Sequence, residues 1–128
     1  DAVHLGEDDG DIEEARQALG PGSLIGVSCY ASVERARALA PGADYLAFGA
    51  LFASGTKPLA RPAPLSVFRE VQALSLARPL VGIGGIDADN IGSVLAAGAD
   101  AAAVIGSLFR QGDVRAAAQR LVAAAARP

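Results

Sequence analysis

Short apolar runs alternate with amphipathic segments along this chain, and each pair has the pattern of a strand followed by a helix. The apolar runs predict strands at residues 2–5, 24–28, 45–48 and 80–83, and over a run that ends at Gly106. The intervening segments predict helices at about 12–19, 32–40, 66–76 and 113–126, with an alanine-rich helix up to Gly98. Consecutive strands joined by helices lie parallel, so the pattern predicts an α/β fold. Residues 49–64, which lack a hydrophobic period, predict a long loop.

The segment 80–109 is the most informative unit of the chain. Its first strand ends in Gly84 and Gly85, and its second apolar run ends in Gly106. Glycine lets backbone N–H groups approach a ligand without interference from a Cβ atom, and an oxyanion suits such a position. In (β/α)8 barrels a phosphate commonly sits on the loops after the last two strands. The alternative is two buried strands that end in ordinary turn glycines.

An internal repeat indicates the architecture. The segment LIGVS at Leu24 recurs as LVGIG at Leu80, and GAD at Gly42 recurs as GAD at Gly98, both 56 residues later. A repeat that holds two strand-helix units favours a wound parallel barrel, and four such repeats would give about 220 residues, the size of a (β/α)8 TIM barrel. We therefore expect a single domain over residues 1–128, a partial barrel of about five parallel strands without the first three units.

Composition excludes several classes of protein. Apolar runs are interrupted well before the roughly 20 residues of a membrane span, and the start DAVHLG lacks the pattern of a signal peptide, so we expect a cytoplasmic protein with no membrane contact. One cysteine excludes an internal disulfide, and one histidine argues against a zinc site. The arginines are scattered over the predicted helices without a basic patch, so nucleic acid is not an expected partner.

The charge is distributed unevenly. Seven of the 14 acidic residues lie in the first 14 positions, which leaves the remaining residues with a net charge of +4 against −3 for the whole chain. The acidic end could hold a divalent cation while the rest tolerates phosphates. The alternative is a solvated turn and the first turn of a helix, where the helix dipole favours Asp and Glu.

The predicted strand ends bring together groups that suit a diphosphate bridged by Mg²⁺ and a separate phosphate. These groups, in chain order, are Glu7, Asp8 and Asp9; Ser28 and Cys29; Gly49 and the loop to Lys57; Gly84 and Gly85; and Gly106 and Ser107. Lys57 is the only lysine beside ten arginines and would reach a phosphoryl oxygen, unless it is a solvated loop residue. Ser28 could equally cap a turn. Cys29 lacks a neighbouring base, which favours packing, and His4 is expected to be a packed strand-end histidine rather than a general base.

Six segments, in order and spacing, resemble the strand-end motifs of the thiamine phosphate synthase family: VHLGEDD, LIGVSCY, GADYLAFGALF, SGTK, VGIGGIDADN and GADAAAVIGSLF. The resemblance covers essentially the whole chain and matches the family from its fourth strand onward. It implies a (β/α)8 barrel that joins hydroxymethylpyrimidine diphosphate to a thiazole phosphate and releases diphosphate. It also implies that Mg²⁺ and basic groups stabilise the departing diphosphate.

The same resemblance assigns roles to residues. Asp9 matches the carboxylate that binds Mg²⁺, and Ser28 and Lys57 match the catalytic groups on the pyrimidine diphosphate. The residues that match the thiazole phosphate site are Ser54, Gly55, Thr56, Gly85, Ile105 and Gly106. Three positions depart from the family pattern, namely Glu7 for Gln, Ser54 for Thr and Gly106 for Ser, so that a contact at Gly106 must come from the backbone.

The family's pyrimidine-binding segment and its other Mg²⁺ carboxylate belong to earlier strands. We therefore expect this chain alone to be catalytically impaired unless a missing N-terminal segment completes it. A second hypothesis is a non-catalytic phosphate-binding partial barrel that pairs with itself as a homo-oligomer to cover its open edge strands. A thiazole tautomerase relative is disfavoured, because residues 49–51 are Gly-Ala-Leu where that branch has a histidine. Another phosphate-binding barrel enzyme would not explain the acidic turn and the GTK loop together.

Overall fold

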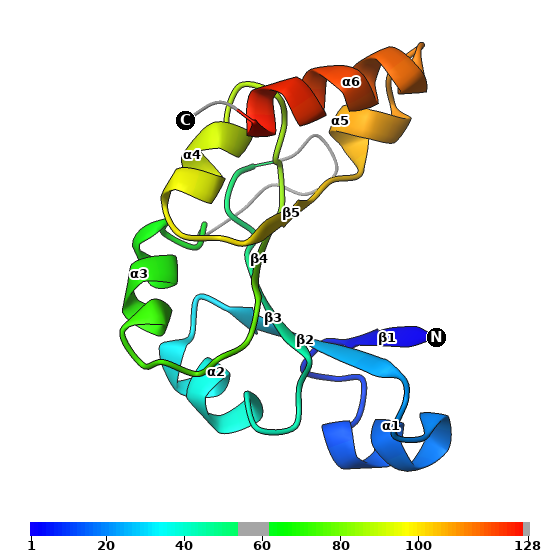
Figure 1. Ribbon diagram of the computed structural model, residues 1–128, viewed down its shortest axis with the longest axis vertical. Helices are drawn as coiled ribbons and strands as arrows, with labels where there is room; N and C mark the ends of the chain where they lie inside the picture. The colour runs from blue at the N-terminus through cyan, green and yellow to red at the C-terminus, as the bar shows by residue number, and fades with distance from the viewer. Residues whose placement is uncertain (54–61, 127–128) are drawn as a thin grey trace.

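The computed structural model describes residues 1–53 and 62–126. Strands and helices alternate along most of the chain (Figure 1). In chain order the elements are β1 (Ala2–Leu5), α1 (Ile12–Leu19), β2 (Leu24–Tyr30), α2 (Val33–Leu39), β3 (Tyr45–Phe48), α3 (Ser66–Gln72), β4 (Leu80–Ile83), α4 (Ile91–Ala96), β5 (Ala101–Ala103), α5 (Gly106–Phe109) and α6 (Val114–Ala125). The predicted α/β class is confirmed.

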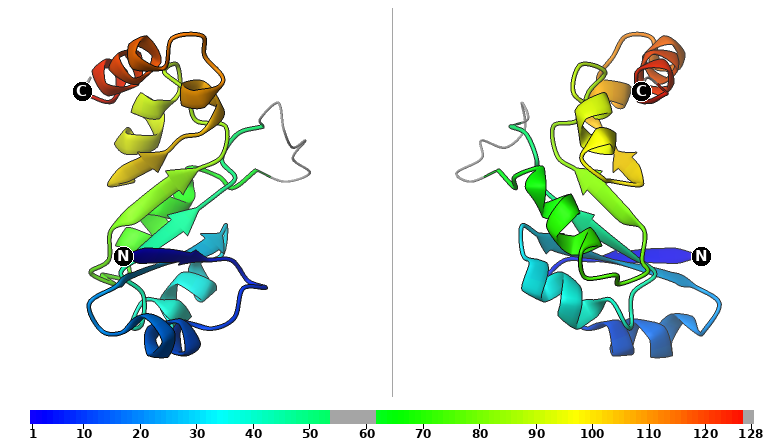
Figure 2. Two further views of the ribbon diagram at one scale, coloured as in Figure 1. Left: turned by 90° about the vertical axis from the view of Figure 1, so that its right-hand side faces the viewer. Right: turned by 60° about the vertical axis from the view of Figure 1, so that its left-hand side comes forward.

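The five strands form one parallel sheet in the order β1-β2-β3-β4-β5, so each strand pairs with its neighbours in sequence. The sheet twists and curves, and helices α2, α3 and α4 lie along its convex face (Figures 1 and 2). In a parallel sheet all carboxyl ends of the strands meet at one edge. The loops that follow β1 to β5 therefore share one rim, as the sequence pattern predicts.

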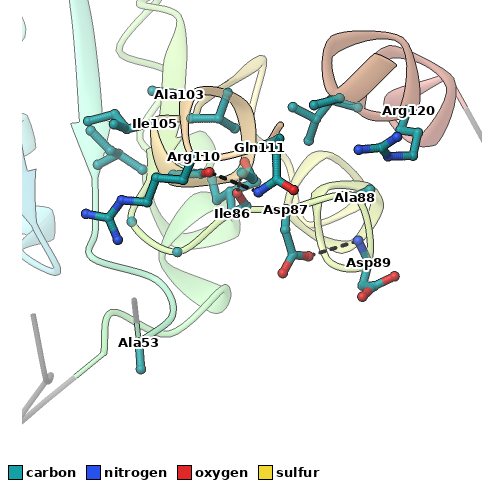
Figure 3. Close-up of a pocket in the computed structure, with 18 residues that line it drawn as sticks. Ala53, Ile86, Asp87, Ala88, Asp89, Ala103, Ile105, Arg110, Gln111 and Arg120 are labelled. Atoms are coloured by element: carbon teal, nitrogen blue, oxygen red, sulfur yellow. Dashed lines mark hydrogen bonds between the residues drawn. The ribbon is translucent and has the colours of Figure 1, made fainter. Parts of the chain in front are cut away.

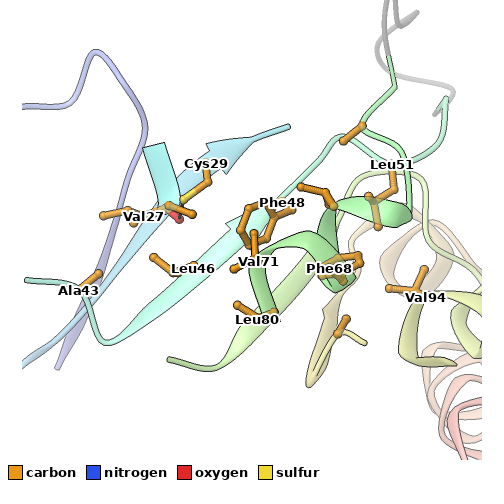
Figure 4. Packing of buried hydrophobic residues seen from close by; sticks show 14 of the residues in the cluster. Val27, Cys29, Ala43, Leu46, Phe48, Leu51, Phe68, Val71, Leu80 and Val94 are labelled. Atoms are coloured by element: carbon orange, nitrogen blue, oxygen red, sulfur yellow. Dashed lines mark hydrogen bonds between the residues drawn. The ribbon is translucent and has the colours of Figure 1, made fainter. Parts of the chain in front are cut away.

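The core lies between the convex face of the sheet and these helices (Figure 4). Alternate residues of β2 and β3, among them Val27, Leu46 and Phe48, are buried toward the helices. Phe48 meets Phe68 of α3 edge to face, with 5.7 Å between ring centroids. Because strand side chains alternate between faces, the intervening residues of the strands point to the concave face.

Several predicted element bounds are confirmed, and others change for local reasons. Ser32 caps α2 by accepting a hydrogen bond from the Arg35 N–H, as expected. Helix α3 ends at Gln72, before the predicted end near residue 76, because Ser75 and Ala77 adopt positive φ angles of 52° and 57° that no α-helix contains.

The end of the chain also differs from its prediction. Strand β5 has only three residues and ends before Gly106, which instead begins the unpredicted helix α5. Ile105, between the two elements, is 70% exposed. An apolar sequence run therefore continues past the true strand end, and hydrophobicity alone overestimates the strand.

Asp44, in the first GAD segment, directly precedes β3 and links this strand to β2. Its carboxylate accepts a hydrogen bond from the Ile25 N–H at 2.7 Å and another from the Arg16 guanidinium at 3.0 Å. These hydrogen bonds hold the pKa of Asp44 below its ordinary value of 3.8, and the bond from the Ile25 backbone has the larger effect. A depressed carboxyl pKa contributes stability above the unfolded-state pKa, and this stability is lost as the pH falls through the lower folded-state pKa.

We therefore expect the thermal midpoint of the wild-type protein to fall steeply below pH 3.8, and that of Asp44→Asn to fall less steeply from a lower starting value. Scanning calorimetry between pH 2.5 and pH 7 measures both slopes. Glu34→Gln is the matched control, because the exposed Glu34–Arg37 pair at 3.9 Å contributes little. Parallel acid profiles for the wild type and Asp44→Asn would contradict the expectation.

Candidate functional site

A cavity of about 820 Å³ opens at the carboxyl ends of β4 and β5. Figure 3 shows its lining side chains, which come from the loops after both strands, from α5 and from α6. Three residues assigned by resemblance to a phosphate site, Gly85, Ile105 and Gly106, line this cavity together with Arg110 and Arg120. The fold thus brings the two predicted glycine sites to one hollow.

Glycine is required at the end of β4 for a conformational and a steric reason. Gly84 and Gly85 have φ angles of +98° and +64°. A Cβ atom at Gly84 would lie 2.4 Å from the Cβ of Ala50, and one at Gly85 would lie 2.6 Å from the carbonyl oxygen of Phe52. The backbone conformation and the close packing both require glycine at this pair, and the close packing also sets the wall of the cavity.

Helix α5 presents a cation and backbone donors to the same cavity. A Cβ atom on Gly106 would lie 3.6 Å from Cδ of Arg110, so the arginine side chain lies beside this glycine. Ser107 Oγ donates to the Ile86 carbonyl at 2.7 Å, which ties the β5 loop to the β4 loop. Within the part of the chain that the structure describes, the N–H groups of Gly106 and Ser107 donate to no other residue.

Sequence reasoning missed Arg110 because it did not predict α5. The available signal was an arginine four residues after Gly106, the glycine that ends an apolar run. This spacing places the arginine beside the glycine only if Gly106 begins a helical turn.

The Asp87–Asn90 turn that follows β4 is held by hydrogen bonds of its own side chains. Asp87 Oδ1 accepts the N–H groups of Asp89 and Asn90, and the Asn90 amide donates to the Gly85 carbonyl at 3.0 Å.

The acidic turn after β1 is held by its own carboxylate. Asp9 Oδ2 accepts the Gly6 N–H at 2.7 Å, and the Tyr30 hydroxyl accepts the Glu7 N–H at 3.2 Å. Asp11 caps α1 by accepting the Glu14 N–H, and Glu13 and Glu14 lie in the first turn of this helix, where the helix dipole favours acidic residues. In residues 1–53 and 62–126 no three His, Cys, Asp or Glu side chains gather as a metal-binding group.

Ser28 lies on the concave face, half-buried, with its hydroxyl 2.7 Å from Nε2 of His4. The expectation of a packed His4 is wrong in one respect, because the imidazole is exposed on the concave face. The imidazole stacks on the Tyr45 ring, with 5.7 Å between ring centroids, and contacts hydroxyl groups on both sides.

The roles assigned to residues 54–57 stay predictions, because these four residues, Ser54, Gly55, Thr56 and Lys57, lie outside the described residues.

Cys29 is fully buried on the other face of β2, and burial raises the pKa of its thiol to about 11 against the opposing charge of Arg35. The thiolate is the reactive form of cysteine. We therefore expect the native protein to react with a thiol reagent such as dithiobis-nitrobenzoate only at the rate at which it opens, and to react fully in denaturant. Rapid stoichiometric labelling of the native protein would contradict the observed burial.

A parallel sheet in chain order, helices on its convex face and a ligand-sized cavity at the carboxyl ends of the strands define this chain as a partial barrel of the (β/α)8 class. Within this class, the sequence pattern of the family described as thiamine monophosphate synthase matches residues 1–108. The chain therefore belongs to the thiamine monophosphate synthase family.

Individual relatives agree with this assignment. Thiamine-phosphate synthase of Chromobacterium violaceum is 57% identical over 122 residues, which are 94% of this chain and 58% of that protein. The protein of the same name from Halorhodospira halophila is 55% identical over 122 residues, which again are 94% of this chain and 58% of that protein. This chain thus spans less than two thirds of the length of these curated relatives.

Solved structures support the partial barrel. Thiamine phosphate pyrophosphorylase from Pyrococcus furiosus superposes with a TM-score of 0.84 at 37% identity, and the match covers 98% of this chain and 59% of that one. A 3-hexulose-6-phosphate synthase superposes with a TM-score of 0.64 at 23% identity, which shows a shared fold only. In the part of the chain that the structure describes, no helix is both long enough and apolar enough to cross a membrane.

Proposed function

We propose that this chain supplies the thiazole phosphate site and part of the diphosphate site of a thiamine phosphate synthase. The reaction joins hydroxymethylpyrimidine diphosphate to thiazole phosphate and releases diphosphate. One observation carries the proposal: in a member of this family, Gly85, Ile105 and Gly106 line one cavity together with a cation, Arg110. A phosphate monoester needs this combination of backbone donors and positive charge.

The thiazole phosphate would bind between the β4 loop and α5. Its oxygens would accept the N–H groups of Gly106 and Ser107, which have no acceptor among the described residues. Arg110 would add a charge-assisted hydrogen bond from beside Gly106. Anchoring the phosphate in this way would fix the thiazole ring relative to the pyrimidine, and such positioning accelerates a reaction between two bound substrates.

The diphosphate of the other substrate would bind nearer β1 and β2, with Ser28 and Lys57 as its contacts. Asp9 would hold Mg²⁺, and the residues fit this ion in part, because Asp9 offers one exposed carboxylate and Mg²⁺ commonly takes one or two carboxylates plus substrate phosphates. When bound, Mg²⁺ neutralises charge that develops on the leaving diphosphate. The Gly6 N–H holds Oδ2 of that carboxylate within the turn at 2.7 Å.

A non-catalytic phosphate-binding partial barrel is the second candidate. It rests on the same cavity, whose backbone donors and Arg110 would hold a phosphate without taking part in a reaction. In this case thiazole phosphate would bind at the cavity, but no thiamine phosphate would form when both substrates are supplied. Assay of diphosphate release with both substrates and Mg²⁺ separates the two candidates.

Isothermal titration of the purified chain with thiazole phosphate tests the site itself. We expect saturable binding that Arg110→Ala weakens about tenfold or more, since a hydrogen bond to a charged group is worth roughly 1.5–3 kcal/mol. Arg115→Ala is the matched control, because Arg115 is exposed on α6 and does not line the cavity. Equal weakening by both variants, or no binding by the wild type, would overturn the proposed site.

A further inference from the structure

Three side chains from adjacent strands meet on the concave face and form a continuous line of polar contacts. His4 of β1 has Nδ1 2.9 Å from the Tyr45 hydroxyl of β3 and Nε2 2.7 Å from the Ser28 hydroxyl of β2. The register of the sheet creates this meeting, because His4 pairs with Gly26 and Gly26 pairs with Tyr45. A Cβ atom at position 26 would lie 1.9 Å from Cζ of Tyr45, so only glycine leaves room for the tyrosine ring.

The chemistry of the three groups allows two directions of hydrogen bonding. In one, the Tyr45 O–H donates to Nδ1, the Nε2–H donates to Ser28 Oγ, and the serine hydrogen is free to point away from the ring. In the other, Ser28 donates to Nε2 and Nδ1–H donates to Tyr45, so the serine presents only lone pairs to a ligand. An anion is attracted by the first arrangement and repelled by the second.

Both directions keep the same two contacts of His4, and the positive charge near Ser28 favours the first. The backbone carbonyl of Ser28 accepts the Arg35 Nε–H at 2.7 Å, which fixes the strand beneath the hydroxyl and places a positive charge close to it. This charge attracts an anion, and an outward O–H is the arrangement of Ser28 that can donate to an anion.

We propose that Tyr45, His4 and Ser28 form a one-directional hydrogen-bond relay that turns the Ser28 O–H outward as a donor to a diphosphate oxygen. This inference rests on the proposed function, which places a diphosphate at Ser28. His4 and Tyr45 are positioning residues, since they act on the ligand only through the serine. The relay sets the direction of the Ser28 hydroxyl before the ligand arrives, and such preorganisation lowers the cost of binding.

The tautomer of His4 tests the relay without any substrate. His4 is the only histidine in the chain, so its ring nitrogens give unambiguous signals in a long-range ¹H–¹⁵N NMR spectrum. We expect the neutral ring to carry its proton on Nε2 in the wild type. Tyr45→Phe should give a mixture of tautomers, while Tyr30→Phe, which removes a hydroxyl that does not contact His4, should leave the spectrum unchanged. A proton on Nδ1 in the wild type would overturn the relay.

Titration with inorganic diphosphate and Mg²⁺ tests whether the relay strengthens the binding of diphosphate at Ser28. Ser28→Ala and His4→Ala should each weaken binding about tenfold, and the double variant should be no weaker than either single one, because both remove the same contact. His4→Gln, whose amide can donate to Ser28 as Nε2–H does, should regain most of the affinity, while His4→Asn should not. Additive losses would overturn the relay.

The two measurements fail separately. If the wild type binds no diphosphate but carries its proton on Nε2, the proposed diphosphate site is wrong and the tautomer assignment stands. If diphosphate binds but His4→Ala binds it as tightly as the wild type does, the relay is wrong and the proposed site stands.

Discussion

Gly85→Ala is expected to destabilise the protein by about 2–5 kcal/mol and to weaken thiazole phosphate binding more than tenfold. A positive φ costs an alanine about 1–2 kcal/mol, and overpacking adds about 1–3 kcal/mol. The new methyl group would lie 2.6 Å from the Phe52 carbonyl oxygen and 2.8 Å from that of Ala53. The β4 loop must therefore move away from residues 52–53, which shifts the wall of the cavity. Urea unfolding and isothermal titration measure the two effects.

Gly22→Ala is the matched control for this substitution. No atom lies within 4 Å of a Cβ at position 22, so the same chemical change should alter stability by no more than about 0.5 kcal/mol and leave binding intact. If Gly85→Ala keeps wild-type affinity despite its lower stability, the cavity wall at β4 does not shape the phosphate site.

Phe68→Ala is expected to cost about 3–5 kcal/mol of stability, the usual range for a phenylalanine removed from a core. Phe68 is fully buried on α3, where it meets Phe48 edge to face and covers Gly82 of β4 with its Cζ 3.3 Å from the Cβ position. Its removal opens a void between α3 and two strands. Since domains are stable by only about 5–15 kcal/mol, this loss is a large share of the total.

Phe109→Ala provides the comparison, because this phenylalanine of α5 is 65% exposed. It should change the free energy of unfolding by less than about 1 kcal/mol in the same urea titration. Similar losses for the two variants would mean that the packing between α3 and the sheet does not dominate the core.

The regular parts of this fold could be predicted from the sequence because hydrophobic periodicity controls them. The bounds of β1, α1, β3 and β4 agree with the pattern, and Ser32 caps α2 as expected. The end of β5 could not be predicted, since apolar residues continue to Ile105 although the chain leaves the sheet at Ala103. That error concealed α5 and, with it, Arg110.

The candidate site was predictable where it depends on strand ends and not where it depends on contacts across strands. Gly85 and Gly106 reach one cavity because parallel strands end at one rim. The bonds of His4 to Ser28 and Tyr45 depend on the register of three strands and on the space above Gly26. A sequence pattern contains no information on such register until the strands are paired.

The most direct test of the phosphate site is a titration of the ¹⁵N-labelled chain with thiazole phosphate, read residue by residue from its amide signals. We predict that the largest shifts fall on Gly85, Gly106 and Ser107, at the carboxyl ends of β4 and β5. Shifts concentrated around Arg78, at the amino end of β4, or an unchanged spectrum at saturating ligand, would contradict the account.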